Sequence, residues 1–160
     1  MPESLTEDAI ACLDQDDLRL FFKGACHVFA VTLQECRREE NYSLYRVKCG
    51  DKEAYHVYAR SGDVIVDVGG LKREQDYLRW LTNRMGRDTR VQVVPTSKDE
   101  LFQVERIDSW RGSVNKWGLF ADPMFISQAM ERAKTLVLES DRYRATLLSS
   151  VTTTSMSTPR

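Results

Sequence analysis

Residues 53 to 70, EAYHVYARSGDVIVDVGG, constrain the fold more than any other stretch because they carry the pattern of a β-hairpin. Two runs rich in β-branched and aromatic residues, YHVYAR and DVIVDV, flank Ser61-Gly62, and a two-residue loop that contains Gly favours a tight turn between antiparallel strands. With that loop, the pairing places His56 directly opposite Asp67. Directly opposed side chains have Cβ atoms about 4.5 to 5.5 Å apart, so we expect the imidazole and the carboxylate to form a hydrogen bond.

Helical and strand patterns alternate along the rest of the chain. Further strands are predicted at YSLYRVK and at TRVQVV, the second of them ended by Pro95. Helices are predicted after Thr6, at DDLRLFF up to Gly24, at CHVFAVTLQECRRE, from Lys72 to Met85, at LFQVER after the capping residue Ser97, and at PMFISQAMERAKTLVLES. The order of helices, a mainly antiparallel sheet and more helices is an α+β pattern, in which the apolar helix that begins at Cys26 is central and buried.

The length of 160 residues indicates one domain, which can bury about 68 to 70% of its unfolded surface without disulfides. We expect residues 1–148 to form this single domain. The remaining residues, 149–160, are small and hydroxylic, which predicts a disordered tail.

The net charge and the distribution of apolar residues limit the classes of partner and the compartment that we expect. With 23 Lys and Arg against 24 Asp and Glu, the net charge of -1 gives no electrostatic case for nucleic acid or for an anionic membrane. No long apolar run spans a bilayer, and the N-terminus lacks the pattern of a signal peptide. We therefore expect a cytoplasmic protein, or one that is translocated into a host cytosol as a bacterial effector. The four cysteines lack CxxC spacing, which favours free thiols there.

Cys26 is the thiol with the best position for chemistry, since it follows Gly24-Ala25 at the first turn of the buried helix. A helix N-terminus carries about half a positive charge, which favours a thiolate, and its amides can donate hydrogen bonds to an oxyanion. His56 can serve as the base and Asp67 can hold its tautomer. These three residues meet the requirements of nucleophilic cysteine catalysis.

The order of a Cys at a helix start, a His on a strand and an Asp on the next strand resembles the papain-like superfamily, in particular its compact transglutaminase-like, amidase and glutamine-deamidase branch. The resemblance covers roughly residues 20 to 70. It implies a papain-like fold in which Cys26 is the nucleophile, His56 the general base and Asp67 the orienting residue, with no cofactor. A protein or peptide amide is the implied substrate, and hydrolysis, deamidation and transamidation share the thioester step.

Other uses of these residues lead to different expectations. A metal site would need convergent ligands, but Cys36 lies ten residues after Cys26, about 15 Å along the helix, so zinc is disfavoured. The His56–Asp67 pair could also be an ordinary cross-strand contact in a non-catalytic binding or assembly module. For the large aromatic residues, core packing is favoured over a role in the wall of a substrate site. These residues are Trp80, Trp110, Trp117, Phe120 and Phe125.

Overall fold

The computed structural model of the protein describes residues 16–102 and 123–144. The helix predicted after Thr6, the residues Trp110, Trp117 and Phe120, and the tail 149–160 lie outside these ranges. Helices combine with an antiparallel sheet, so the predicted α+β class is confirmed.

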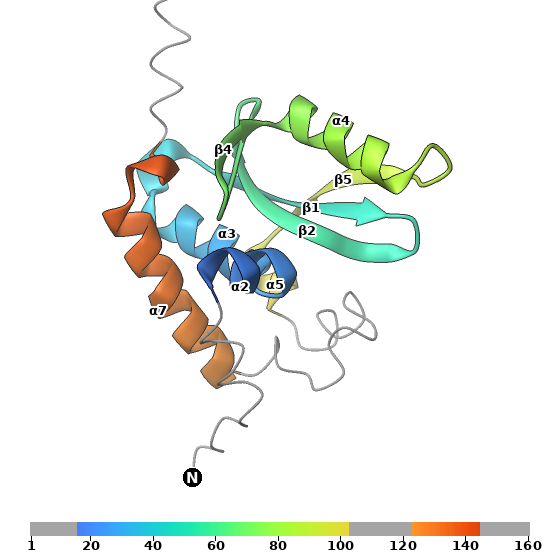
Figure 1. Ribbon diagram of the computed structural model, residues 1–160. Coiled ribbons are helices and arrows are strands. Elements are labelled where there is room, and N and C mark those ends of the chain that lie inside the picture. Colours follow the sequence, from blue (N-terminus) through green and yellow to red (C-terminus); the bar gives the residue numbers. More distant parts are fainter. Residues whose placement is uncertain (1–15, 103–122, 145–160) are drawn as a thin grey trace, which may run out of the picture.

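The sheet has five strands in the order β4-β3-β2-β1-β5 (Figure 1), and every neighbouring pair is antiparallel. Its strands are β1 (Ser43–Cys49), β2 (Lys52–Ser61), β3 (Val64–Asp67), β4 (Gly70–Arg73) and β5 (Val91–Thr96). β5 is an edge strand. The sequence predicted that Pro95 ends this strand, but Pro95 lies within it. An edge strand accepts proline because one of its sides has no ladder partner.

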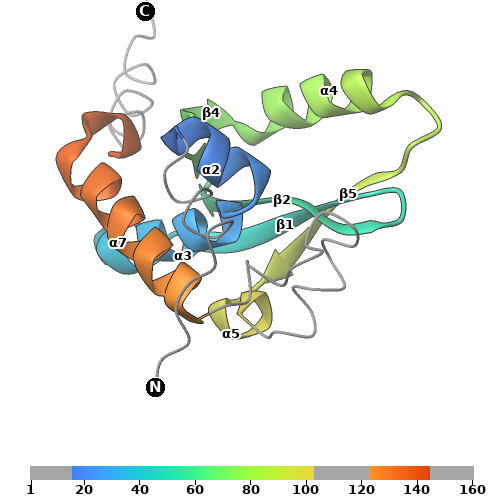
Figure 2. The same cartoon turned by 60° about the horizontal axis from the view of Figure 1, so that its bottom comes forward.

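Helices cover both faces of the sheet (Figures 1 and 2). They are α2 (Asp17–Lys23), α3 (Cys26–Cys36), α4 (Glu74–Met85), α5 (Lys98–Leu101) and α7 (Pro123–Glu139), with single 3₁₀ turns η1 (Arg38–Glu40) and η4 (Asp141–Tyr143). α3 packs between the sheet and α7, and its first eight residues are buried, as the apolar pattern predicted. α4 lies on the opposite face, where Tyr77 and Leu81 pack on Tyr58 and Ile65.

The hairpin register differs from the prediction. Ala59 pairs with Val66 and Ser61 with Val64, so the loop is Gly62-Asp63 and not Ser61-Gly62. Gly62 has a φ of 62°, which suits the first position of a two-residue hairpin loop and explains why the turn begins at the glycine. The predicted direct opposition of His56 and Asp67 is therefore wrong. Because the register moves by two residues, each side chain nevertheless keeps its predicted face.

The segment after β3 also differs. The prediction ran the helix from Lys72, whereas Gly70–Arg73 form the strand β4 and the helix begins at Glu74. β4 folds back on β3 with Asp67 paired to Gly70. This tight return brings Lys72 next to the end of β3, where the candidate site lies.

Candidate active site

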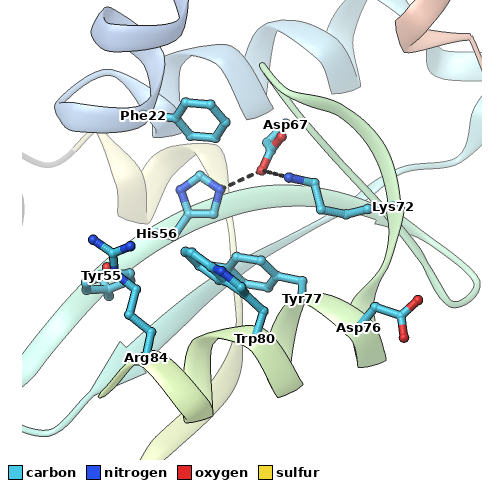
Figure 3. Close-up of a pocket in the computed structure, with 9 residues that line it drawn as sticks. All are labelled: Phe22, Tyr55, His56, Asp67, Lys72, Asp76, Tyr77, Trp80 and Arg84. Atoms are coloured by element: carbon cyan, nitrogen blue, oxygen red, sulfur yellow. Dashed lines mark hydrogen bonds and ion pairs between the residues drawn. The ribbon is translucent and has the colours of Figure 1, made fainter. Parts of the chain in front are cut away.

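The site lies where β2 and β3 separate. The two strands pair only from Ala59 to Ser61, and both His56 on β2 and Asp67 at the end of β3 lie beyond the last pair. The corner between α2 and α3 covers this region, and the ring of Phe22 lies 6.0 Å from that of His56 (Figure 3). Separation of the strands therefore gives a helix end access to side chains of the sheet.

The Asp67 carboxylate is held by three donors. Its Oδ2 accepts hydrogen bonds from Nε2 of His56 and from Nζ of Lys72, each at 3.0 Å, and its Oδ1 accepts the Gly69 N–H at 2.8 Å. Burial alone would raise the pKa of Asp67, but the hydrogen bond with His56 and the charges of His56 and Lys72 outweigh burial and lower it. Asp67 is thus an ionised carboxylate that is fixed in orientation.

The imidazole of His56 connects the carboxylate to the thiol of Cys26. Burial lowers the pKa of His56, but hydrogen bonds with Asp67 and with the Cys26 side chain overcome this effect and raise the pKa to about 9. Because Nε2 faces Asp67, Nδ1 is the ring nitrogen left for the thiol. At neutral pH the ring is therefore an imidazolium between a carboxylate and a sulfur atom.

Cys26 opens α3 at the helix end that faces the His56 ring. Gly24 ends α2, and its N–H donates to the Leu20 carbonyl, so the chain turns sharply into α3. The intrahelical bonds of α3 begin with the Phe29 N–H donating to the Ala25 carbonyl. The positive end of the helix dipole therefore lies at Cys26. The Cys26 residue is only 3% exposed.

A cavity of about 790 Å³ opens over the His56–Asp67 pair. Its wall includes aromatic side chains from α2, β2 and α4, together with charged ones from β4 and α4 (Figure 3). The described residues that line it are Phe22, Tyr55, His56, Asp67, Lys72, Asp76, Tyr77, Trp80 and Arg84. Cys26 is not among these lining residues, so the thiol lies behind the surface that the cavity presents.

Several of these residues were not predicted from sequence. Lys72 was placed in a helix, and only the strand β4 brings its amine to Asp67. Trp80 was expected to favour the core, but it is 51% exposed and lines the cavity, whereas Phe125 is a core residue. The sequence signal for Trp80 is its place on α4 three residues after Tyr77, which puts both rings on one side of that helix.

The remaining candidates lie elsewhere. His27 is buried against Phe102, with ring centroids 5.8 Å apart, Cys36 is at the far end of α3, and Cys49 is in the core under α4. Within residues 16–102 and 123–144, no group of three or more His, Cys, Asp or Glu side chains could hold a metal ion. None of the helices in these ranges has the length and apolar character needed to cross a bilayer.

A thiol, a base and a fixed carboxylate are connected in this order by hydrogen bonds. They lie next to a cavity with aromatic and charged walls. Such a set is able to support nucleophilic attack by sulfur on an acyl carbon. Comparisons of the chain with protein-family models, with curated proteins and with solved structures find no match.

Proposed function

We propose that the protein is a cysteine-dependent acyl-transfer enzyme that acts on an amide of a protein or peptide. The observation that supports this most is the position of the His56 ring, which hydrogen-bonds Asp67 on one side and the Cys26 side chain on the other. A thiol, a base and an orienting carboxylate connected in this order are what nucleophilic cysteine catalysis requires. The resemblance to compact papain-like amidases and glutamine deamidases leads to the same proposal.

In the first half of the reaction, the Cys26 thiolate attacks the amide carbonyl carbon and a C–S bond forms. The tetrahedral oxyanion then collapses, the C–N bond breaks, and the His56 imidazolium gives its proton to the leaving nitrogen, which departs as ammonia or an amine. In the second half, neutral His56 takes a proton from water while the water oxygen attacks the thioester. The acid is released, and the thiolate and imidazolium are restored.

Asp67 and the start of α3 have supporting roles in this scheme. Asp67 holds Nε2 of His56, so that Nδ1 exchanges the proton with sulfur and substrate. We assign the oxyanion to the backbone N–H groups of the first turn of α3, where the helix dipole favours negative charge. Free thiols persist most readily in a reducing compartment, so the proposal places the protein in a cytosol, either the cell's own or that of a host.

The burial of Cys26 favours a second candidate. A sulfur in a residue that is 3% exposed has to become accessible before it can meet an amide, whereas His56 and Asp67 already line the cavity. A binding module that uses this cavity without covalent chemistry is the alternative, and thiol reactivity separates the two.

The test compares alkylation of Cys26 with that of Cys49. Both residues are 3% exposed, so they are matched in burial, but Cys49 packs among core side chains under α4. If His56 activates Cys26, iodoacetamide at pH 6.5 should label Cys26 at least about tenfold faster than Cys49, since lowering a thiol pKa by one unit gives about tenfold more thiolate. The folded protein is labelled, and the rate at each cysteine is then measured by mass spectrometry of its proteolytic peptides.

Variants complete the test. His56→Ala should remove the rate advantage of Cys26, and Asp67→Asn should reduce it less, while circular dichroism shows that both proteins remain folded. Equal rates for Cys26 and Cys49 in the wild-type protein would support the binding module and overturn the proposed enzyme.

A further inference from the structure

The aromatic wall of the cavity is unusually exposed for side chains of this size. Phe22 on α2 is 42% exposed and Trp80 on α4 is 51% exposed, and both line the cavity over His56. The Tyr77 ring lies 6.0 Å from that of Trp80 and 5.7 Å from that of His56. Large apolar surfaces that converge on a cavity from two elements are typical of a binding site for an apolar or planar group.

The charged side chains in the cavity wall differ in whether they form ion pairs. Lys72 is paired with Asp67, and Asp76 lies 3.7 Å from Arg79. Arg84 makes no ion pair with another of the residues that the structure describes, and its guanidinium lies 5.5 Å from the centroid of the Trp80 ring. A cation without a carboxylate partner at the Trp80 end of the cavity is complementary to an anionic group on a ligand.

The cavity residues on α4 follow one another along the helix axis. Tyr77, which contacts His56, is followed after three residues by Trp80 and after seven by Arg84. At 1.5 Å per residue, Trp80 lies about 4.5 Å and Arg84 about 10 Å along the helix from Tyr77. An extended peptide advances about 3.3 to 3.6 Å per residue. By the helical rise, Arg84 is therefore about three residues away from an amide at His56. Helical side chains lean toward the N-terminus, however, and the Arg84 guanidinium lies 5.5 Å from the Trp80 ring centroid, so an acidic group that pairs with it lies one to two residues beyond a side chain at Trp80.

We propose that the cavity selects peptide substrates with an aromatic side chain next to the reactive amide and an acidic side chain one residue further along. This inference rests on the proposed function for the position of the amide, and it assigns the specificity of that site. The aromatic side chain lies between Phe22 and Trp80, and the acidic group pairs with Arg84.

The experiment measures binding without chemistry, in the Cys26→Ala protein. The probes are N-acetyl-Glu-Phe-amide and N-acetyl-Phe-Glu-amide, which present the same groups in both chain directions. Their controls replace Glu by Gln or by Lys, or replace Phe by Ala. Dissociation constants come from the shift of the indole N–H signal of Trp80, which is assigned with Trp80→Phe.

At least one Glu–Phe probe should bind about threefold tighter than its Gln form, as expected for an exposed ion pair, and about tenfold tighter than its Ala form. Arg84→Glu should reverse the charge preference in favour of the Lys probe. Arg87→Glu is the matched control, because it makes the same charge change at an exposed residue that is not among those lining the cavity. It should leave the preference for Glu unchanged.

The outcomes for specificity and for catalysis are distinguishable. A Glu preference that depends on Arg84 supports this inference even if Cys26 alkylates no faster than Cys49, a result that overturns only the enzyme. Three results would overturn the assigned specificity, whatever the reactivity of Cys26. They are equal affinity for probes with and without Glu and Phe, no shift of the Trp80 signal on addition of peptide, and broadening of that signal by self-association without peptide.

Discussion

Nε2 of His56 lies 3.0 Å from Oδ2 of Asp67, and the two residues are only 5% and 2% exposed. A buried carboxylate is stable as an anion only where donors replace its hydration, and Asp67 has an imidazole, an amine and a backbone amide. The pair therefore links the protonation of His56 to the geometry of the turn between β3 and β4.

The first prediction concerns the ionisation of His56. Its imidazole should titrate with a midpoint well above the ordinary value of 6.5, near the pKa of about 9 that its partners favour. Asp67→Asn should lower this midpoint, because burial of the ring then acts with less opposition. The two histidines of the chain make the titration easy to follow by NMR, with His27 as the second signal. A wild-type midpoint below 6.5 would contradict the imidazolium in the site.

The second prediction concerns stability in acid. The folded-state pKa of Asp67 is below the ordinary value of 3.8, so its ionisation stabilises the fold above that value, and this contribution is lost as the pH falls through the folded pKa. His56 does not obscure this effect below about pH 5, because its pKa is 6.5 or higher in both the folded and the unfolded chain. The free energy of unfolding should therefore fall between about pH 5 and pH 2 partly through Asp67.

Urea unfolding across this pH range measures the effect. Lys72→Met should flatten the fall, because losing the amine brings the pKa of Asp67 closer to 3.8, and Asp67→Asn should flatten it further. The exposed pair Arg79–Asp76 provides the control, since Arg79→Met removes one positive charge from a surface ion pair. An acid limb of the same steepness in wild-type and Asp67→Asn protein would show that the fold does not lower the pKa of Asp67.

Much of the fold could be predicted from the sequence because its signals are local. Gly24 marked the end of α2, Pro123 the start of α7, and the apolar run from Cys26 the buried helix. The hairpin was predicted with the wrong loop, since both Ser61-Gly62 and Gly62-Asp63 satisfy the turn pattern. The choice depends on which loop position requires the positive φ of Gly62, and the residue types leave that open.

The candidate site was predicted only in part, for a non-local reason. Both loops put His56 and Asp67 on one face, so their contact did not depend on the right register. The approach of Lys72 depends on β4, a four-residue strand whose GLKR sequence lacks strong β-forming residues. Trp80 is exposed although Leu81, the next residue on α4, is fully buried, because successive side chains point to different sides of a helix. Which side of α4 faces the sheet and which faces the cavity is a property of packing that no local pattern contains.

The third prediction concerns Gly69, whose N–H binds Asp67. A Cβ at this position would lie 3.0 Å from both Oδ1 of Asp67 and the ring tip of Phe22, so Gly69→Ala should displace the carboxylate or the ring. The expected result is a lower His56 midpoint and slower alkylation of Cys26. Gly86→Ala is the control, because its φ of 90° makes it costly to the fold while no atom lies within 4 Å of the added Cβ. If both variants change the His56 titration equally, the effect is general destabilisation.

The last prediction concerns the hydrogen bond that ties η4 to the turn after β3. The Tyr143 hydroxyl donates to the Val68 carbonyl at 2.7 Å, and both residues are buried. Tyr143→Phe leaves that carbonyl without its donor and should lower the free energy of unfolding by about 1 to 3 kcal/mol. Because Val68 lies between Asp67 and Gly69, the turn should also open more often, which exposes the Gly69 N–H that Asp67 accepts. Hydrogen exchange of this amide should therefore accelerate more than exchange in β1.

Tyr45→Phe is the control, since the Tyr45 hydroxyl accepts a hydrogen bond from Arg60 away from the turn. This variant should lower the free energy of unfolding without selectively accelerating exchange at Gly69. Uniform acceleration in both variants would mean that Tyr143 stabilises the whole fold and does not hold the turn that positions Asp67.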